Sequence, residues 1–390
     1  MSLHSQLQFI EQLHASGRAL QAAPLEALFV QTHPVPAQAW SDLAWVQLRL
    51  GAVDAARPLL EKAYAIDPYC PEALDGLAEV HARLGATDQA RRFGLEALDA
   101  KDALSAQASV SPAPRETLTG QRVVAFSLFG RDAFYSECAV RNAADVARWY
   151  PGWECRFYIG TEVCEEVRAR LRALGAQVML PPAAHAHLPG TVWRFLALDD
   201  LQASHVVCRD ADSPITLREM QAVQHWLASG CTAHVMRDHW THTELMLAGL
   251  WGARTAALRG ISAGLQTYFT QVRHPTHADQ HFLRDWVWPR VRHSVLQHDS
   301  CFAWQGSADF PQPRTHDAEH VGNAPYDPVT LHPSANAPPE LSYSLLRYTA
   351  SSVPALLGRY RVQRHADAYT VRMPPGYGEQ VQRGELALVW

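Results

Sequence analysis

Lysine is almost absent from this chain, which has 390 residues and lysine only at Lys62 and Lys101. Arginine therefore supplies nearly all of the positive charge, and acidic and basic residues are well mixed, with a formal net charge of -5. A balance of this kind predicts neither a general nucleic-acid binder nor a protein held on a membrane surface by charge.

Long apolar segments and cysteine pairs are missing as well. No apolar run reaches the ~18 residues that a membrane-spanning helix needs, and residues 1–6 have no basic segment followed by an apolar stretch, so we expect neither a membrane span nor a secretory signal. The seven cysteines form no CxxC pair. This pattern is typical of reduced thiols, and it predicts a cytoplasmic protein.

The common nucleotide and hydrolase motifs are also absent. No GxGxxG follows the first predicted strand of the central region, and GxxxxGK[ST] occurs nowhere, which argues against a Rossmann dinucleotide domain and a P-loop enzyme. HExxH and GxSxG are missing too, which removes the simplest metalloprotease and hydrolase interpretations.

The chain is long enough for two or three domains, and hydrophobic residues make up 47% of it. Changes in composition and residue pattern along the sequence predict four segments. These are a helical repeat region at 1–104, a linker at 105–120, an α/β domain at 121–310, and a Pro-rich segment with a small extension at 311–390.

The N-terminal region repeats with an offset of 34 residues, at which Leu50–Arg57 recurs as Leu84–Arg91. Gly17 and Pro34 precede Gly51 and Pro68 at the same offset. Glycine permits a tight turn between two helices, small alanines let the helices approach closely, and proline ends the second helix. This pattern resembles the tetratricopeptide repeat, and it predicts six antiparallel helices in three stacked pairs over residues 2–102.

The repeats predict a fold more strongly than a function. One interpretation is a stacking or dimerising module without a ligand. The other is a concave groove that binds a peptide or a partner protein.

Strand and helix patterns alternate between residues 121 and 236, which predicts βαβ units and a mostly parallel sheet. Ligands bind such sheets at the carboxyl ends of the strands. The predicted strands are 122–128, 155–159, 176–180, 205–208 and 232–236, and the predicted helices are 137–150, 162–174, 191–202 and 216–227.

Two carboxylates follow the strand at 205–208, in the sequence Asp210-Ala211-Asp212. Oxygen ligands of this kind suit a hard divalent cation, which could bridge two phosphates and stabilise charge on a departing diphosphate. The alternative is that Asp212 only caps the following helix.

The surrounding residues carry a resemblance. The stretch Val207–Glu219 looks like the nucleotide-sugar site of GT-A type glycosyltransferases, most closely bacterial members that share RDxDS…RE…W. Later stretches fit the same resemblance: His234–His239, Leu247–Gly252, Asp279–Leu283 and His298–Ser300. The resemblance spans roughly residues 121–305 and implies a multidomain protein, with an all-α repeat array before an α/β GT-A domain.

The resemblance implies a metal site. Asp210 and Asp212 would hold Mn²⁺ or Mg²⁺ together with the donor, and His298 would complete the metal shell. For His298 the alternative is a surface histidine with no role.

It also implies a donor site. The end of the first strand, with Phe126, Ser127 and Leu128, would contact the nucleotide. Arg131 would contact it as well. Arg194 would neutralise the diphosphate, unless it only forms a surface salt bridge.

Asp238 and Asp279 are the candidates for acceptor binding or for a general base, with helix capping as the alternative for each. A late Lys-Pro-Trp found in some relatives is missing after His298. The outcome at the anomeric carbon, retention or inversion, is therefore left open.

Histidine pairs one helical turn apart offer a rival metal site. His239 with His242, or His277 with His281, could contribute to a zinc site. Because the chain has 20 histidines, such pairs also arise by chance.

The composition of the chain changes after Phe310, where prolines become frequent. Prolines between 311 and 339 predict an extended crossing segment, residues 341–357 a helix, and residues 360–362 with 369–373 a small hairpin.

Taken together, these patterns predict a metal-dependent glycosyltransferase. It would move a sugar from a nucleotide-diphosphate sugar, with a UDP-sugar preferred, to an acceptor that is a protein, a glycan or a small molecule. The repeats would bind a protein acceptor or mediate dimerisation. The alternative is an inactive transferase-like scaffold in which the repeats bind a partner protein.

Overall fold

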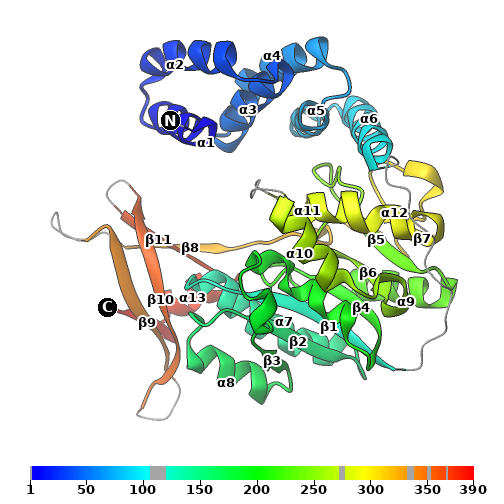
Figure 1. Ribbon diagram of the computed structural model, residues 1–390. Helices are drawn as coiled ribbons and strands as arrows, with labels where there is room; N and C mark the ends of the chain where they lie inside the picture. Colours follow the sequence, from blue (N-terminus) through cyan, green and yellow to red (C-terminus); the bar gives the residue numbers. More distant parts are fainter. Residues whose placement is uncertain (1, 106–119, 272–276, 332–337, 349–352, 366–367) are drawn as a thin grey trace. The chain divides into compact units, whose positions relative to one another are not determined.

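The computed structural model describes residues 2–105, 120–271, 277–331, 338–348, 353–365 and 368–390. The chain divides into two compact units (Figure 1). The helical unit comprises Met1–Ser109 with two later segments, Arg237–Leu245 and Asp299–Asp309. The α/β unit comprises Val110–Met236, Met246–His298 and Phe310–Trp390. Most of the predicted linker, 105–120, lies outside the described residues.

The predicted helical repeats are confirmed, since the described residues from 2 to 105 contain helices and no strand. Gly17, Gly51 and Gly85 lie in the turns inside the pairs, with φ of 72°, 77° and 75°. Glycine adopts this left-handed backbone at little cost, which explains its 34-residue spacing. The helices are α1 (Leu3–Ala15), α2 (Ala19–Thr32), α3 (Pro36–Arg49), α4 (Val53–Ile66), α5 (Pro71–Arg83) and α6 (Thr87–Ser105).

Small side chains bring the paired helices together. Ala22, Ala56 and Ala90 occupy the same position in the second helix of each pair, and each is 0% exposed. A larger residue at these positions would push the helices apart, so the repeat in sequence is a repeat in packing.

A seven-stranded sheet forms the centre of the α/β unit, in the order β3-β2-β1-β4-β6-β5-β7. The β3-β2-β1-β4 part is parallel, whereas β6 runs antiparallel to both β4 and β5. The sheet is therefore mostly parallel, as predicted. The strands are β1 (Gln121–Leu128), β2 (Glu154–Ile159), β3 (Gln177–Met179), β4 (Ala203–Arg209), β5 (Ala233–Arg237), β6 (Leu250–Arg254) and β7 (Val295–Asp299).

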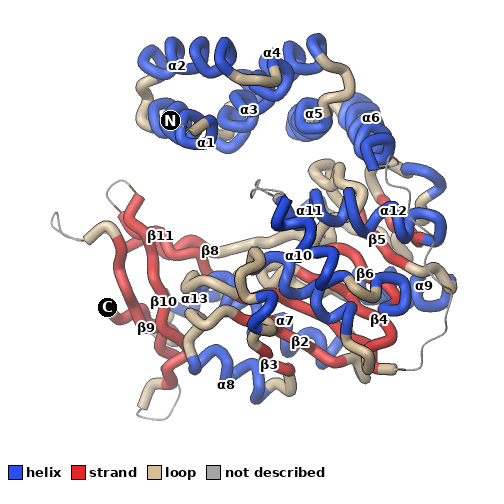
Figure 2. The backbone as a smooth tube through the Cα atoms, in the orientation of Figure 1, coloured by secondary structure: helices blue, strands red, loops and turns tan. Residues whose placement is uncertain are grey.

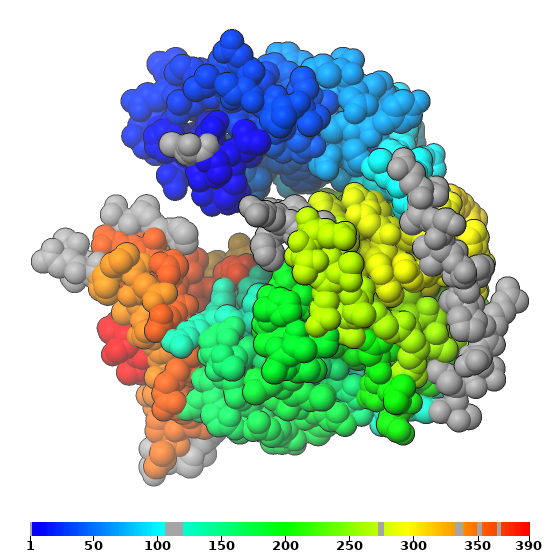
Figure 3. Space-filling view, viewed as in Figure 1, coloured from blue at the N-terminus to red at the C-terminus, as the bar shows by residue number. Residues whose placement is uncertain are grey.

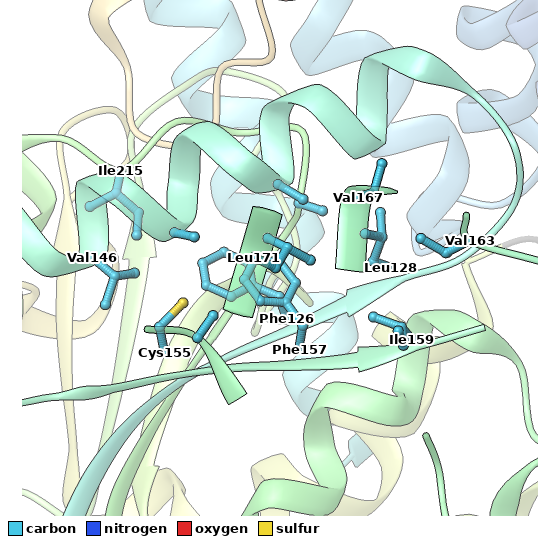
Figure 4. Packing of buried hydrophobic residues seen from close by; sticks show 14 of the residues in the cluster. Phe126, Leu128, Val146, Cys155, Phe157, Ile159, Val163, Val167, Leu171 and Ile215 are labelled. Atoms are coloured by element: carbon cyan, nitrogen blue, oxygen red, sulfur yellow. The ribbon is translucent and has the colours of Figure 1, made fainter. Parts of the chain in front are cut away.

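Predicted helices connect the strands, with one exception. The connecting helices include α7 (Ala133–Trp149), α8 (Glu165–Ala173) and α9 (Leu217–Ser229), and later come α10 (Ile261–Gln271), α11 (Ala278–Phe282) and α12 (Trp288–Val291). The predicted helix at 191–202 is instead a run of 3₁₀ turns, Gly190–Asp199. Figure 4 shows the core beneath α7 and α8, where Phe126 stacks on Phe157 with ring centroids 4.6 Å apart.

The tail of the chain forms a second, five-stranded sheet, in the order β12-β9-β10-β11-β8 (Figure 2). The helix predicted at 341–357 is therefore wrong. The sequence there alternates with a period of two, with Tyr343 and Leu345 buried and Ser342 and Ser344 more exposed, which is a strand pattern. The strands are β8 (Asp327–Leu331), β9 (Glu340–Arg347), β10 (Ala355–His365), β11 (Ala368–Met373) and β12 (Leu386–Val389), with the short helix α13 (Tyr377–Gln382) before β12.

The predicted hairpin is confirmed, because β10 and β11 pair antiparallel. A buried charge cluster joins this sheet to the rest of the α/β unit. Glu137 on α7 accepts hydrogen bonds from Arg170 at 2.7 and 2.8 Å and from the hydroxyls of Tyr360 and Tyr377. In the space-filling view the C-terminal strands, orange to red, lie against the green part of the same unit (Figure 3).

Candidate active site

The loop that carries Asp210 and Asp212 leaves the carboxyl end of β4, a strand flanked by β1 and β6. Asn142 on α7 holds this loop, since its side-chain amide donates to the carbonyl oxygens of Ala211 and Ser213, both at 3.0 Å. Because both acceptors are buried backbone groups, the loop has a fixed conformation beside the helix.

Arg209 ties the same loop to a neighbouring chain segment. Its side chain is fully buried and forms an ion pair with Glu219 at 2.9 Å. It donates to the carbonyl oxygen of Gly249 at 2.5 Å and to the hydroxyl of Ser213 at 3.2 Å. Gly249 lies so close that a Cβ atom there would be 1.9 Å from Oδ2 of Asp210. The site therefore requires glycine at this position.

A cavity of about 660 Å³ opens at this edge of the sheet. Asp210, Asp212, Arg194, Asp279 and Leu128 line it, and all five were predicted as site residues. Its position, at the carboxyl ends of β1 and β4, is where parallel sheets bind ligands.

Arg194 lies between two carboxylates of this cavity. Its side chain is 4% exposed, Nη1 donates to Oδ1 of Asp210 at 2.6 Å, and Nη2 lies 3.5 Å from Oδ2 of Asp279. The hydroxyl of Ser127 accepts a hydrogen bond from the Arg194 backbone N–H at 2.9 Å, which fixes the position of the main chain. Nε of Arg194 is buried and has no hydrogen-bond partner within the described residues.

The second carboxylate, Asp212, has a different environment. Burial, and then repulsion by Asp210, raise the pKa of Asp212 to about 6. In the described part of the chain Asp212 has no ion pair, whereas Asp210 has Arg194. Two adjacent carboxylates that repel each other fit a divalent cation, because oxygen donors are present and the positive charge would relieve the repulsion.

His298 does not join this pair, contrary to the prediction. It is fully buried, its Nδ1 lies 2.8 Å from Nε2 of His234, and its Nε2 lies 3.0 Å from Nδ1 of His225. Both ring nitrogens are therefore used within a histidine chain. Burial, then His225 and Arg218, lower the pKa of His298 to about 4, so the His298 ring is neutral at pH 7.

Three further predicted residues lie elsewhere. Phe126 is 0% exposed and belongs to the core, because β1 is buried on both faces, and it does not line the cavity. Arg131 lies beyond Gly130, whose φ of 82° turns the chain away, and it lines a different cavity. Asp238 belongs to the helical unit, where it accepts a hydrogen bond from the Ser300 hydroxyl at 2.6 Å and does not line the cavity.

The rival zinc sites are not formed either. The described residues contain no group of three or more His, Cys, Asp or Glu side chains that could hold a metal ion. This finding also applies to Asp210 and Asp212, beside which the described residues place no third side chain of these four types.

Sequence reasoning missed several residues of the cavity wall, among them Phe129, Tyr135 and Thr191, whereas Ser127 was expected at the nucleotide and does line the cavity. Tyr135 lies in the first turn of α7, directly after β1, and burial with the nearby Asp212 raises its pKa. Because Tyr135 follows a predicted strand end, the sequence could have indicated it as a site residue. No sequence pattern indicates Asn142, because its role depends on contacts about 70 residues away in the chain.

The repeats are also recognisable by family. Residues 47–109 match the family model described as a tetratricopeptide repeat. The N-terminal region is a tetratricopeptide repeat array. Within the described residues no helix is long and apolar enough to cross a membrane.

Comparisons of the chain with curated proteins and with solved structures identify no further family. A search of curated proteins finds no match. Among solved structures, a mutant O-GlcNAc transferase from Thermobaculum terrenum is similar at 16% identity and a TM-score of 0.28. The match covers 53% of this chain and 45% of that one, less than half of its length. A TM-score this low does not indicate a shared fold, so no function is taken from it.

Proposed function

We propose that the α/β unit is a metal-dependent GT-A type glycosyltransferase that uses a nucleotide-diphosphate sugar as donor, with a UDP-sugar preferred. One observation carries the proposal. Asp210 and Asp212 leave the carboxyl end of a buried strand and line a cavity of about 660 Å³ together with Arg194 and Asp279. Paired carboxylates in such a position are the oxygen donors that a cation–diphosphate pair needs.

The charge of a diphosphate supports a requirement for Mn²⁺ or Mg²⁺. Residues 121–390 contain no lysine, and the two aspartates alone would repel the donor. Asp210 and Asp212 would hold the cation, which would supply Lewis-acid stabilisation of the departing diphosphate.

The remaining side chains would orient the reactants. Arg194, already fixed by Ser127, would donate hydrogen bonds to a diphosphate oxygen. Leu128 and Tyr135 would form the wall for the nucleotide. Asp279 would accept a hydrogen bond from the acceptor hydroxyl, or its proton, as the bond between the sugar and the diphosphate breaks.

The repeats support an acceptor that is a protein or a peptide. Arrays of this kind present helix faces to partners, and they would bring the acceptor to a cytoplasmic enzyme or hold two copies of it together.

Thermal stability tests the proposal. UDP with Mn²⁺ should raise the melting temperature of the full chain, because a ligand that binds only the folded state stabilises it. Asp212→Ala should abolish the shift, whereas Asp88→Ala, in the exposed first turn of α6, should preserve it. An equal shift in Asp212→Ala would contradict the proposal.

A second candidate is an inactive scaffold in which only the repeats bind a partner. The lack of a third His, Cys, Asp or Glu beside the two aspartates, as far as the structure describes the chain, favours it. The two candidates differ in one result, since a scaffold would show no shift with any of several nucleotide sugars.

A further inference from the structure

A second cavity, of about 400 Å³, lies in the α/β unit and shares no lining residue with the first. One wall is the five-stranded sheet. The other comes from the turns that follow β1 and β2, with Arg131 and Glu162. Val389 and Trp390 complete the lining, so residues far apart in the sequence meet here.

The sheet wall is polar because of strand alternation. Ser342 on β9 lies opposite Arg361 on β10, and Ser344 lies opposite Arg359, so all four share one face. The tyrosines between them, Tyr343 and Tyr360, are 3% and 2% exposed and pack into the core. The tyrosines fix one face of the β9–β10 pair against the core. The opposite face therefore carries two arginines and two serine hydroxyls.

The arginines at this cavity, Arg131, Arg359 and Arg361, are balanced in formal charge by three glutamates in or beside it. Arg359 pairs with Glu166, and Arg361 pairs with Glu340 at 2.9 Å. Arg131 is exposed, and within the described residues it has no ion pair. The carboxylate of Glu162, inside the cavity, accepts the Gly130 N–H at 2.7 Å. This hydrogen bond fixes the position of the carboxylate and leaves its negative charge in the cavity.

An indole side chain adds an apolar surface. Trp390 is 71% exposed, and Val389 is 47% exposed beside it. An exposed aromatic ring in a polar cavity can pack against the C–H face of a sugar ring, whereas serine hydroxyls can bind sugar hydroxyls. A planar guanidinium binds carboxylate and phosphate oxygens with two parallel hydrogen bonds.

From these residues we infer a binding site for a sugar that carries an oxyanion, either a carboxylate or a phosphate. Arg131 binds the oxyanion, Ser342 and Ser344 bind hydroxyls, and Trp390 covers one face of the ring. This site does not depend on the proposed transfer reaction, because none of its residues lines the Asp210 cavity.

Calorimetric titration of the full chain tests the inference with four probes: glucuronic acid, glucose 6-phosphate, glucose and inorganic phosphate. One or both charged sugars should bind about tenfold more tightly than glucose and phosphate, since a charge-assisted hydrogen bond contributes about that much. Binding of glucuronic acid alone would identify a carboxylate ligand, and binding of glucose 6-phosphate alone a phosphate ligand.

Variants locate the binding. Arg131→Gln and Trp390→Ala should each weaken it about tenfold. Asp212→Asn and Arg383→Gln, which change the other cavity and an exposed ion pair on the surface, should leave it unchanged. Equal affinity for glucose, no binding of either charged sugar, or an unchanged affinity in Arg131→Gln would overturn the inference. Loss of binding in Asp212→Asn would place the sugar in the other cavity and would also overturn it.

Discussion

Arg194 contacts two of the carboxylates that line the Asp210 cavity. It is buried, and it lies 2.6 Å from Asp210 and 3.5 Å from Asp279. A cation at Asp210 must therefore share this carboxylate with a guanidinium, and the two positive charges repel each other. A diphosphate would remove the conflict, because it offers negative oxygens to both.

Arg194→Gln should therefore change how the affinity for Mn²⁺ depends on the nucleotide. Without nucleotide, the variant should bind Mn²⁺ more tightly than the parent, by about tenfold, because the competing charge is gone. With UDP present the advantage should disappear, because the variant has lost a donor to the diphosphate. Electron paramagnetic resonance of free Mn²⁺ measures both affinities, and weaker binding of Mn²⁺ alone to the variant would refute this account of Arg194.

His298 gives a prediction about acid stability. Its pKa falls from an ordinary value of about 6.5 to about 4, chiefly through burial, so the unfolded chain binds the proton more readily. Folding stability from this group is complete above about pH 6.5 and is lost as the pH falls towards 4, by on the order of 3 kcal/mol. Urea unfolding between pH 7 and pH 4 should show a shallower pH dependence in His298→Gln than in the exposed control His316→Gln.

The element that follows β4 shows what local sequence can predict. A buried strand ending in two aspartates was visible in the sequence, and the structure has Asp210 and Asp212 at a strand end as expected. The structure does not bring Phe126 and Arg131 to this cavity, because β1 is buried on both faces and the chain turns at Gly130. Neither feature follows from the alternation of residues in the strand, since it depends on what packs against the strand.

Asn142 allows a test of how this element is held. Asn142→Ala would leave two buried carbonyl oxygens, of Ala211 and Ser213, without their donor. We expect a loss of about 2 kcal/mol in unfolding free energy and weaker binding of UDP with Mn²⁺, because the loop loses its fixed conformation. Asn323→Ala, which removes a similar bond in an exposed turn, should change neither property by a comparable amount. Equal effects of the two variants in urea unfolding and calorimetry would argue against this role.

The helical unit is built from segments that lie far apart in the sequence. Arg237–Leu245 and Asp299–Asp309 belong to it, although a division at residues 105–120 places them in the α/β domain. Lys101 on α6 is 2% exposed and contacts Asp75 at 2.8 Å and Glu244 at 2.7 Å. Contacts over 142 residues, such as that from Lys101 to the carbonyl oxygen of Thr243, leave no trace in local patterns. The repeat helices were predictable because their period is local.

Lys101→Met tests whether this cluster holds the helical unit together. Asp75 and Glu244 would be left without their cation, and removing one partner of a buried ion pair costs about 3–5 kcal/mol. Lys62→Met is the matched control, because Lys62, the other lysine, is exposed and lies over the Trp40 ring. We expect a clear fall in the unfolding midpoint for the first variant only. Similar midpoints for both would show that the cluster contributes little.

The most direct test of the proposed function is the release of UDP from a UDP-sugar by the purified chain. We expect release, by transfer or by hydrolysis, with Mn²⁺ or Mg²⁺, and none in excess EDTA, because Asp210 and Asp212 would repel the donor without a cation. Asp212→Asn should slow the release by orders of magnitude and keep the fold, since a neutral amide binds hard cations poorly. Full activity in EDTA, or an Asp212→Asn variant as fast as the parent, would contradict the proposal.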